Sequence, residues 1–244
     1  MRETNEDALA VAQQDDMVCF VMADGAGGHE AGEVAAGIVV DAVLQRFLKE
    51  SCFGLRALRS YVEAAAYGVA QGKKAAPRRD DMSTTLATLL IDQSNHQALW
   101  AHLGDTRIYL FRGGKLLQVT KDHSVAQQFI DAGFARVEQL RGHPRRNTLY
   151  GAIGAEPGMP AEATEQAVPL RGGDVFLICT DGFWEWVHED DMERTLAEAV
   201  SSNEWLSAMN KLADAKVAAA EKTRDNYSVF AIWVREPTPR AGTK

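Results

Sequence analysis

The stretch that most constrains this chain is Val21–Gly32, which reads VMADGAGGHEAG. An apolar run bounded by glycine predicts a buried strand, so Asp24 stands where that strand ends and a loop begins. The glycines give the loop backbone conformations closed to other residues and let the main chain approach a ligand. A carboxylate on a rigid strand end, beside bare backbone carbonyls, suits a hard metal ion. Taken alone, the same residues also fit a strand–turn–helix with a solvated Asp, since glycine-rich turns are common.

Repetition of this pattern favours the metal interpretation. Four further acids stand at strand ends or in turns beside apolar strands: Asp7, Asp105, Asp181 and Asp225. Carboxylates gathered from strand ends into one partly buried pocket lose hydration and repel one another, at a cost of several kcal/mol each. The sequence offers few cationic partners beside these acids. A divalent metal ion is therefore the expected neutralising partner.

Composition narrows the function classes. The chain has 244 residues, enough for one large domain, and a net charge of −8, which argues against a nucleic-acid or anionic-membrane surface. No apolar run approaches the ~20 residues of a membrane span. The three cysteines are scattered and lack the spacing of a disulfide framework, which is typical of reduced thiols. We expect a cytoplasmic protein with no nucleic-acid and no membrane partner.

At this point the residues resemble a known family. Seven pieces occur in the family's order from residue 2 to about residue 234: RETNED, VMADGAGGHEAGE, MSTTLATLLI, AHLGDTRIYLFRGGKLLQVTKDHS, HPRRNTLYGAIG, FLICTDGFWE and DNYSVFAIW. Together they resemble the bacterial branch of the metal-dependent protein serine/threonine phosphatases, the PP2C or PPM family. DGAGGHEAGE and GDTR in one chain are specific, whereas either alone would be only a moderate signal.

The fold that the resemblance implies is α+β, a four-layer α-β-β-α sandwich of two antiparallel sheets packed face to face between helices. It implies a single PP2C-like domain over residues 1–235, with a mobile flap at about 122–155 and a disordered tail at 236–244. The pattern agrees with this fold. Amphipathic periodicity predicts helices at Glu33–Glu50, Leu55–Ala76 and Asn203–Glu221. A capping box at Ser124 and a glycine stop at Gly133 predict a short helix at Ser124–Ala132. Strands are expected at Ala163–Pro169 and Gly172–Thr180, and Ala98–Phe111 predicts a hairpin turning through Gly104-Asp105.

The activity that the resemblance implies is hydrolysis of phosphoserine and phosphothreonine in proteins. Two Mn²⁺ or Mg²⁺ ions would bridge a hydroxide that attacks phosphorus in line. All-oxygen ligation suits these ions and disfavours Zn²⁺. The resemblance assigns the ligands as Asp7, Asp24, the carbonyl of Gly25, Asp181 and Asp225. Asp105 would help hold a third ion, although an aspartate that takes positive φ easily also fits a simple turn.

Three further residues receive roles from the resemblance. Arg2 would hold the substrate phosphate, which suits a guanidinium because its fork binds phosphate oxygens bidentately. Glu6 would orient metal-bound water without touching the metal. Animal members carry a histidine directly after the Asp-Gly, where this chain has Ala26, and His29 lies three residues on. Three roles stay open for His29: it could donate a proton, bind substrate or pack in the structure.

The segment RGHPRRN, Arg141–Asn147, is basic in an acidic protein. A cluster of Arg141, His143, Arg145 and Arg146 beside the site would attract an acidic, phosphorylated segment, and an equally good interpretation is a solvated loop. We hypothesise that Arg145 and Arg146 set the affinity for phosphoprotein substrates.

Rival interpretations can be weighed on the sequence. A haloacid-dehalogenase phosphatase needs an Asp two residues before each Asp-Gly, where this chain has Met22 and Cys179. A P-loop fails because the glycine loop lacks its Gly-Lys-Ser/Thr ending. The remaining alternative is a catalytically inactive PP2C-like binding or scaffold module, which predicts missing metal acids, and all the matched acids are present. We expect a monomer that reverses a bacterial Ser/Thr kinase and has phosphorylated proteins as partners.

Overall fold

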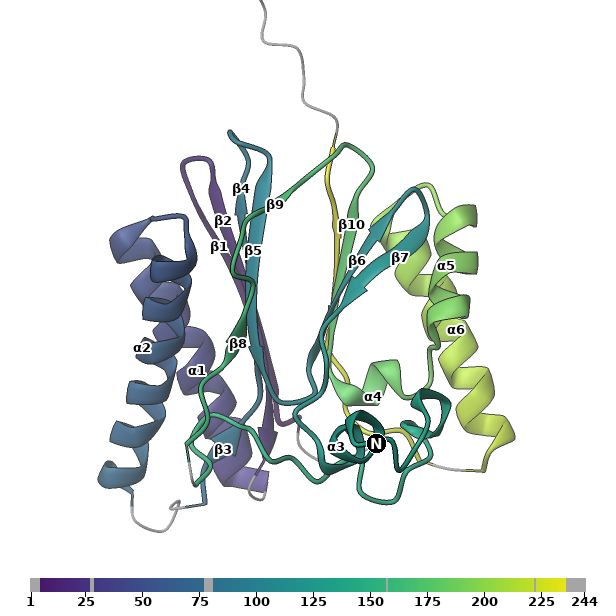
Figure 1. Ribbon diagram of the computed structural model, residues 1–244, viewed down its shortest axis with the longest axis horizontal. Coiled ribbons are helices and arrows are strands. Elements are labelled where there is room, and N and C mark those ends of the chain that lie inside the picture. The colour runs from purple at the N-terminus through teal and green to yellow at the C-terminus, as the bar shows by residue number, and fades with distance from the viewer. Residues whose placement is uncertain (1–4, 27–28, 77–80, 157, 222, 236–244) are drawn as a thin grey trace, which may run out of the picture.

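The computed structural model describes residues 5–26, 29–76, 81–156, 158–221 and 223–235, and of His29 the backbone alone. The predictions for Arg2, for the tail at 236–244 and for the start of the charged connector at 77–81 fall on residues outside these ranges. Figure 1 shows four layers: a helical pair, a sheet, a second sheet and a second helical layer. The predicted α+β sandwich of two antiparallel sheets between helices is therefore confirmed.

The first sheet has seven strands, and its central path runs β1-β2-β4-β5-β8. Every pairing within it is antiparallel. β3 pairs with β2, and β9 pairs with β5. The strands are β1 (Asp7–Gln14), β2 (Met17–Ala26), β3 (Ser83–Thr84), β4 (Leu86–Asp92), β5 (Gln97–Leu103), β8 (Glu162–Ala163) and β9 (Val168–Pro169).

The second sheet has four antiparallel strands in the order β11-β10-β6-β7. They are β6 (Arg107–Arg112), β7 (Lys115–Val119), β10 (Val175–Cys179) and β11 (Val229–Trp233). β6 and β7 form a hairpin through Gly113 and Gly114, whose positive φ angles of 59° and 74° favour glycine.

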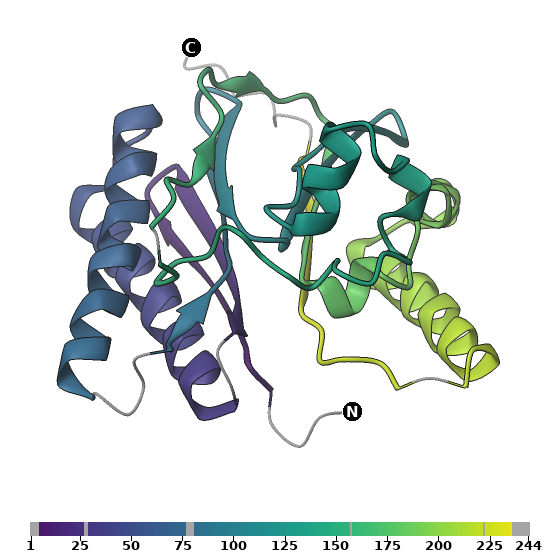
Figure 2. The ribbon, with the colours of Figure 1, turned by 60° about the horizontal axis from the view of Figure 1, so that its bottom comes forward.

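The helices cover the outer faces and one end. α1 (His29–Glu50) and α2 (Leu55–Ala75) lie on the first sheet, while α5 (Glu189–Glu198) and α6 (Ser202–Ala219) lie on the second. Three short helices gather at one end of the sandwich (Figures 1 and 2). They are α3 (Val125–Asp131), the 3-10 helix η2 (Val137–Gln139) and α4 (Asp181–Trp184).

Side-chain alternation along β2 explains the layering. Cys19, Val21 and Ala23 pack into the core beneath α1 and α2, whereas Val18 and Met22 pack into the core between the two sheets. Because successive strand residues point to opposite faces, a strand buried on both faces must be apolar throughout. This explains why the run before Asp24 is continuous rather than alternating.

The predicted hairpin at Ala98–Phe111 is wrong. β5 belongs to the seven-stranded sheet and β6 to the four-stranded sheet, so the turn at Gly104-Asp105 carries the chain from one sheet to the other. Both strands are buried along nearly their whole length, because each lies between a helical layer and the opposite sheet. Two continuously apolar strands have the same sequence pattern whether they pair as a hairpin or belong to different sheets, so the sequence alone could not decide between these arrangements.

Smaller corrections concern element bounds and faces. α1 begins at His29 rather than Glu33, and the expected strand Ala163–Pro169 is two separate short strands, β8 and β9. On α6 the buried residues are Trp205, Met209 and Ala213, whereas Leu206, Leu212 and Val217 are only half-buried. The ring of Trp205 packs edge-on against the ring of Phe111, with the ring centroids 5.4 Å apart.

Candidate active site

Asp7 and Asp24 lie opposite each other at one end of the first sheet. Asp7 begins β1, and the antiparallel register pairs it with Asp24 near the end of β2. The hydroxyl of Thr180 donates a hydrogen bond to Asp7 Oδ2 at 3.1 Å. The backbone N–H of Asp24 donates to Thr85 Oγ1 at 2.8 Å, and its carbonyl accepts from the Thr85 N–H at 2.8 Å. Both carboxylates are thus fixed by backbone pairing.

Asp181 and Asp225 come from the second sheet. Asp181 is the first residue of α4, directly after β10, and Asp225 precedes β11. A Cβ on Gly182 would lie 2.1 Å from the Asn226 carbonyl oxygen, so only glycine lets the two loops pack this closely. Arg224 Nε donates to the Gly182 carbonyl at 2.9 Å and ties the same loops together. The two acids are therefore held side by side at the end of β10 and β11.

Asp105 is buried in the connection between the sheets. Gly104 has a φ of +108°, and a Cβ there would lie 2.6 Å from Thr85 Cγ2. The indole N–H of Trp184 donates to the Asp105 carbonyl at 2.8 Å. The turn that carries Asp105 is thus packed between β4 and α4, beside the other acids.

The electrostatics of the site show that these carboxylates converge. Burial raises the pKa of Asp7, raises the pKa of Asp24 and Asp105 well above its usual range, and raises the pKa of Asp181 to about 7. Repulsion adds to burial: Asp24 feels the charges of Asp181, Asp7, Asp105 and Asp225. Acids from both sheets are therefore near enough at this end of the sandwich for their charges to raise the pKa of Asp24.

The residues present fit divalent cations. Every donor that the five acids offer is a carboxylate oxygen, the ligand type of Mg²⁺ and Mn²⁺. Within the described residues, no three of these acids bring ligand atoms within 4.8 Å of one another, so the fit rests on the chemistry of the donors.

A cavity of about 320 Å³ adjoins Asp181 and Asp225. Arg146 and Glu185, which form an ion pair, line the same cavity. Glu185 was not predicted as a site residue, and neither were Thr85 and Thr180. The available signal for Glu185 was its position one helical turn after Asp181 in FLICTDGFWE.

The basic segment does not act as one cluster. Arg141 donates to both carboxylate oxygens of Glu189 at 2.8 Å and to the Trp184 carbonyl at 3.0 Å, so its charge is already paired. Arg146 faces the cavity through its pair with Glu185, whereas the Arg145 side chain is exposed. The four predicted basic residues are thus divided between structural and solvent-facing positions.

Of the remaining predicted residues, Glu6 and Gly25 can be placed. Glu6 is buried, and its carbonyl accepts from the Gly25 N–H at 3.1 Å. A Cβ on Gly25 would lie 2.3 Å from Gly32 C, so the close approach between β2 and α1 requires glycine there. Arg2 lies outside the described residues, and His29 is placed only as the first residue of α1.

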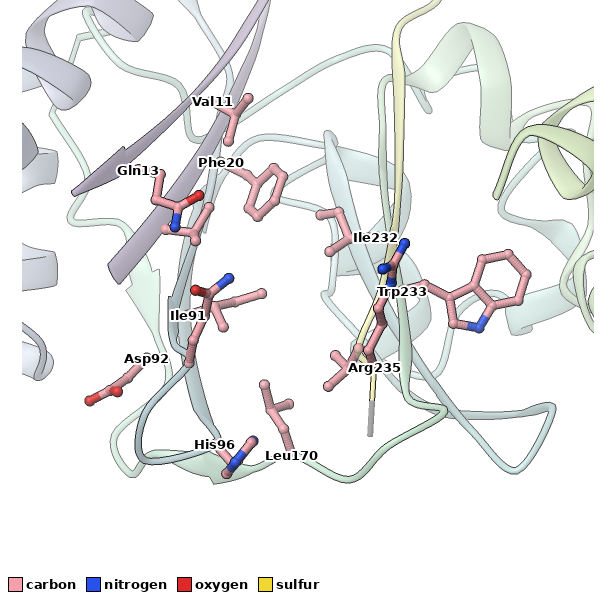
Figure 3. A pocket seen from close by; sticks show the side chains of 13 residues that line it. Val11, Gln13, Phe20, Ile91, Asp92, His96, Leu170, Ile232, Trp233 and Arg235 are labelled. Carbon is pink, nitrogen blue, oxygen red and sulfur yellow. The ribbon is translucent and has the colours of Figure 1, made fainter. Parts of the chain in front are cut away.

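A larger cavity lies at the opposite end of the sandwich. It has a volume of about 800 Å³ between the two sheets, and Phe20, Ile91, Leu170 and Ile232 point into it (Figure 3). None of the predicted site residues lines it, and its walls are mostly apolar. The size of a cavity is therefore no guide to the acidic site in this protein.

Comparison with known proteins agrees with the site. The family model described as protein phosphatase 2C matches residues 2–215. Serine/threonine phosphatase stp of Listeria monocytogenes is 32% identical over 203 residues, which cover 80% of this chain and 79% of that protein. Serine/threonine protein phosphatase PstP of Mycobacterium tuberculosis is 32% identical over 213 residues, 87% of this chain. This chain spans only 39% of the length of PstP.

Solved structures agree as well. A crystal structure of the M. tuberculosis PstP phosphatase superposes with a TM-score of 0.82 at 28% identity, covering 97% of this chain and 94% of that one. The PstP catalytic domain in complex with two manganese ions superposes with a TM-score of 0.79, also at 28% identity and with the same coverage.

The family match and these relatives confirm the predicted resemblance to the bacterial PP2C family. The chain belongs to the protein phosphatase 2C family.

Proposed function

We propose that this protein hydrolyses phosphoserine and phosphothreonine in phosphorylated proteins with the help of two divalent cations, Mn²⁺ or Mg²⁺. The observation that carries the proposal is the convergence of buried aspartates from both sheets, whose burial and mutual repulsion raise the pKa of Asp7, Asp24, Asp105 and Asp181. Cations beside these carboxylates would offset the repulsion that their charged forms impose on the folded protein at neutral pH. The M. tuberculosis PstP domain, in complex with two manganese ions, supports the assignment.

The proposed roles follow the position of each residue. The groups that would hold two ions are Asp7, Asp24, the carbonyl of Gly25, Asp181 and Asp225. Asp105, buried in the same region, would help hold a third ion. When bound, the ions supply an activated water and neutralise the charge of the phosphate ester.

The chain's own side chains do the rest of the positioning. Thr180 orients the Asp7 carboxylate through its 3.1 Å hydrogen bond. Arg146, beside Asp181 in the cavity, offers a cation to an incoming phosphate once Glu185 releases it. We keep Arg2 as the guanidinium that holds the phosphate, Glu6 as the group that orients water, and His29 as a substrate-binding residue or proton donor.

The setting is a further part of the proposal. We infer a single catalytic domain over residues 1–235 with residues 122–155 as its flap, acting as a monomer in the cytoplasm against a cognate Ser/Thr kinase. The free cysteines Cys19, Cys52 and Cys179 support a reducing compartment. Among the described helices, none has the length and apolar character to cross a bilayer.

The experiment is phosphate release from phosphoserine and phosphothreonine peptides by EDTA-treated protein, with Mn²⁺ or Mg²⁺ added back. We expect activity only with added metal, its loss in Asp24→Asn, and its retention in Asp16→Asn, a matched change at an exposed aspartate in the turn between β1 and β2. Hydrolysis that survives EDTA, or that survives Asp24→Asn, would overturn the proposal.

A further inference from the structure

Two buried histidines lie together near the edge of the first sheet, outside the set of aspartates. His102 on β5 and His123, two residues before α3, are each only 3% exposed. Their ring centroids are 4.8 Å apart, with the ring planes inclined by 37°. Neither histidine had a role in the sequence analysis, and the phosphatase chemistry proposed above does not use either one.

An acid completes the group. Glu162 on β8 is the cross-strand partner of His102, so both side chains stand on the same face of the sheet. Glu162 Oε2 lies 3.8 Å from His123 Nε2. The three side chains offer one ligand atom each, all within 4.8 Å of one another.

The hydrogen bonds of the two rings fit metal ligation. His102 Nε2 lies 2.8 Å from the Lys121 carbonyl, which can only accept, so Nε2 carries the proton and Nδ1 is left as a lone-pair donor. The Gly104 N–H donates to His123 Nδ1 at 3.1 Å, and the Gly104 carbonyl oxygen lies 3.3 Å from the same nitrogen. An ion bound at His123 Nε2 therefore requires the tautomer with its proton on Nδ1, in which Nδ1 donates to the Gly104 carbonyl instead. Metal-binding histidines commonly hold a backbone carbonyl with their second nitrogen in this way.

From this arrangement we propose that His102, His123 and Glu162 form a second metal site, which takes a zinc-type transition-metal ion rather than Mg²⁺ or Mn²⁺. Two imidazoles and one carboxylate, with a fourth position open to water, are a ligand set of Zn²⁺. Ligand atoms around tetrahedral Zn²⁺ lie about 3.3 Å apart, given metal–nitrogen bonds of about 2.0 Å. The Glu162 side chain is 63% exposed, so it can move the short distance needed.

A cavity adjoins two of the three proposed ligands. It has a volume of about 330 Å³ and is lined by His102 and Glu162 together with Gln118, Lys121 and Thr164, whereas His123 does not line it. The backbone N–H of His123 donates to the backbone carbonyl of Gly104 at 2.9 Å, and Gly104 directly precedes Asp105. A bound ion would therefore join β5, β8 and the start of α3 next to the turn that carries Asp105. Its expected effect is to stabilise the folded protein.

The test measures metal binding on untagged protein, stripped with EDTA and then saturated with Mg²⁺ to occupy the all-oxygen site. We expect Zn²⁺ to bind with one further equivalent by calorimetry and to raise the midpoint of thermal unfolding. Co²⁺ in its place should give the intense visible absorption of a four- or five-coordinate ion. The weak absorption of an octahedral one would indicate the oxygen site instead.

Variants decide whether these residues hold the ion. Glu162→Gln and His102→Gln should each weaken Zn²⁺ binding at least about tenfold, since loss of even an outer-shell partner costs that much. Glu165→Gln, at an exposed acid three residues along, should bind as the wild type does. Because Glu162 is exposed, its variant will fold even if the buried His102 variant does not. No Zn²⁺ equivalent beyond the Mg²⁺ site, or unchanged affinity in folded Glu162→Gln, would overturn the proposal.

Discussion

Asp181 is the residue whose titration reports most directly on the acidic site. Its pKa is raised to about 7, first by burial and then by the charges of Glu185, Asp225 and Asp7, from an ordinary value of 3.8. At pH values between 3.8 and about 7, Asp181 keeps its proton in the folded protein but has released it in the unfolded chain. Stability of the metal-free protein therefore falls as pH rises through this window, and above about pH 7 the buried charge costs on the order of a few kcal/mol.

The first prediction is that Asp181→Asn stabilises the metal-free protein at alkaline pH. In EDTA, the variant should unfold at a higher temperature than the wild type at about pH 8, and with little difference at about pH 5, because only the charged carboxylate is unfavourable. Thermal unfolding of both proteins across this range measures the difference. Burial lowers the pKa of His102 and of His123, which makes stability rise with pH, opposite to the effect of Asp181. This contribution is the same in the wild type and the variant, so it cancels when the two proteins are compared.

Adding Mn²⁺ should reverse the order of the two proteins. The wild type then gains stability by binding the ion, and Asp181→Asn, which lacks one carboxylate, gains less. A variant that is no more stable than the wild type in EDTA at alkaline pH would show that Asp181 is not held in a repulsive cluster.

At the level of elements, the contact between the end of β2 and the start of α1 sets the geometry of the site. Gly25 follows Asp24 directly, and its backbone lies against Gly32 of α1. The same glycine-rich stretch therefore serves packing as well as the carbonyl ligand proposed for Gly25.

The second prediction compares two glycine substitutions. Gly25→Ala should destabilise the protein by about 1–3 kcal/mol, because the new methyl group would lie 2.3 Å from the Gly32 backbone and must push α1 away. Gly37→Ala, within α1 and with no atom within 4 Å of the new Cβ, should instead stabilise it by about 0.5–1 kcal/mol. Urea unfolding measures both. Equal effects of the two changes would contradict the role given to the β2–α1 contact.

The third prediction concerns the segment between β7 and β8. Arg145 is exposed and free to meet a phosphopeptide, so Arg145→Ala should raise KM for phosphopeptides about two- to fivefold, the range of an exposed ion pair, and leave p-nitrophenyl phosphate hydrolysis unchanged. Arg146 lines the cavity with Asp181, so Arg146→Ala should impair both substrates.

Steady-state kinetics with both substrates separate these outcomes. Arg59→Ala, at an exposed position on α2, is the matched control and should change neither substrate. If Arg145→Ala impairs the small substrate as much as the peptide, the segment acts on chemistry rather than on recognition.

For the whole molecule, the family resemblance implied the four layers and the sequence pattern agreed with them, but the pattern did not give the connections between the strands. Buried, continuous runs such as the one ending at Asp24 imply sheets covered on both faces, and the helices beside them follow from amphipathic periodicity. The pattern could not say that β5 and β6 part into different sheets, because that depends on contacts distant in sequence. One is the hydrogen bond between Thr85 and Thr106, whose hydroxyl oxygens are 2.6 Å apart.

The same division applies to the site. The acids could be found because each stands at a strand end, a position visible in sequence. Thr180, Thr85 and Glu185 could not, because their roles follow from which loop packs on which. Thr180, for example, reaches Asp7 across 173 positions of sequence. Arg141 was grouped with the substrate-facing residues because its partner, Glu189 of α5, is distant in the sequence. The sequence alone therefore did not show that the charge of Arg141 is paired.

The measurement that tests the central claim most directly is a Mn²⁺ titration of EDTA-treated protein, following bound ions by calorimetry and p-nitrophenyl phosphate hydrolysis in parallel. We predict that hydrolysis is absent without metal, rises as the all-oxygen site fills, and is lost together with tight Mn²⁺ binding in folded Asp181→Asn. Hydrolysis without metal, or a folded wild-type protein that neither binds Mn²⁺ nor hydrolyses the substrate, would contradict the claim. The second outcome would describe a binding module with a phosphatase fold.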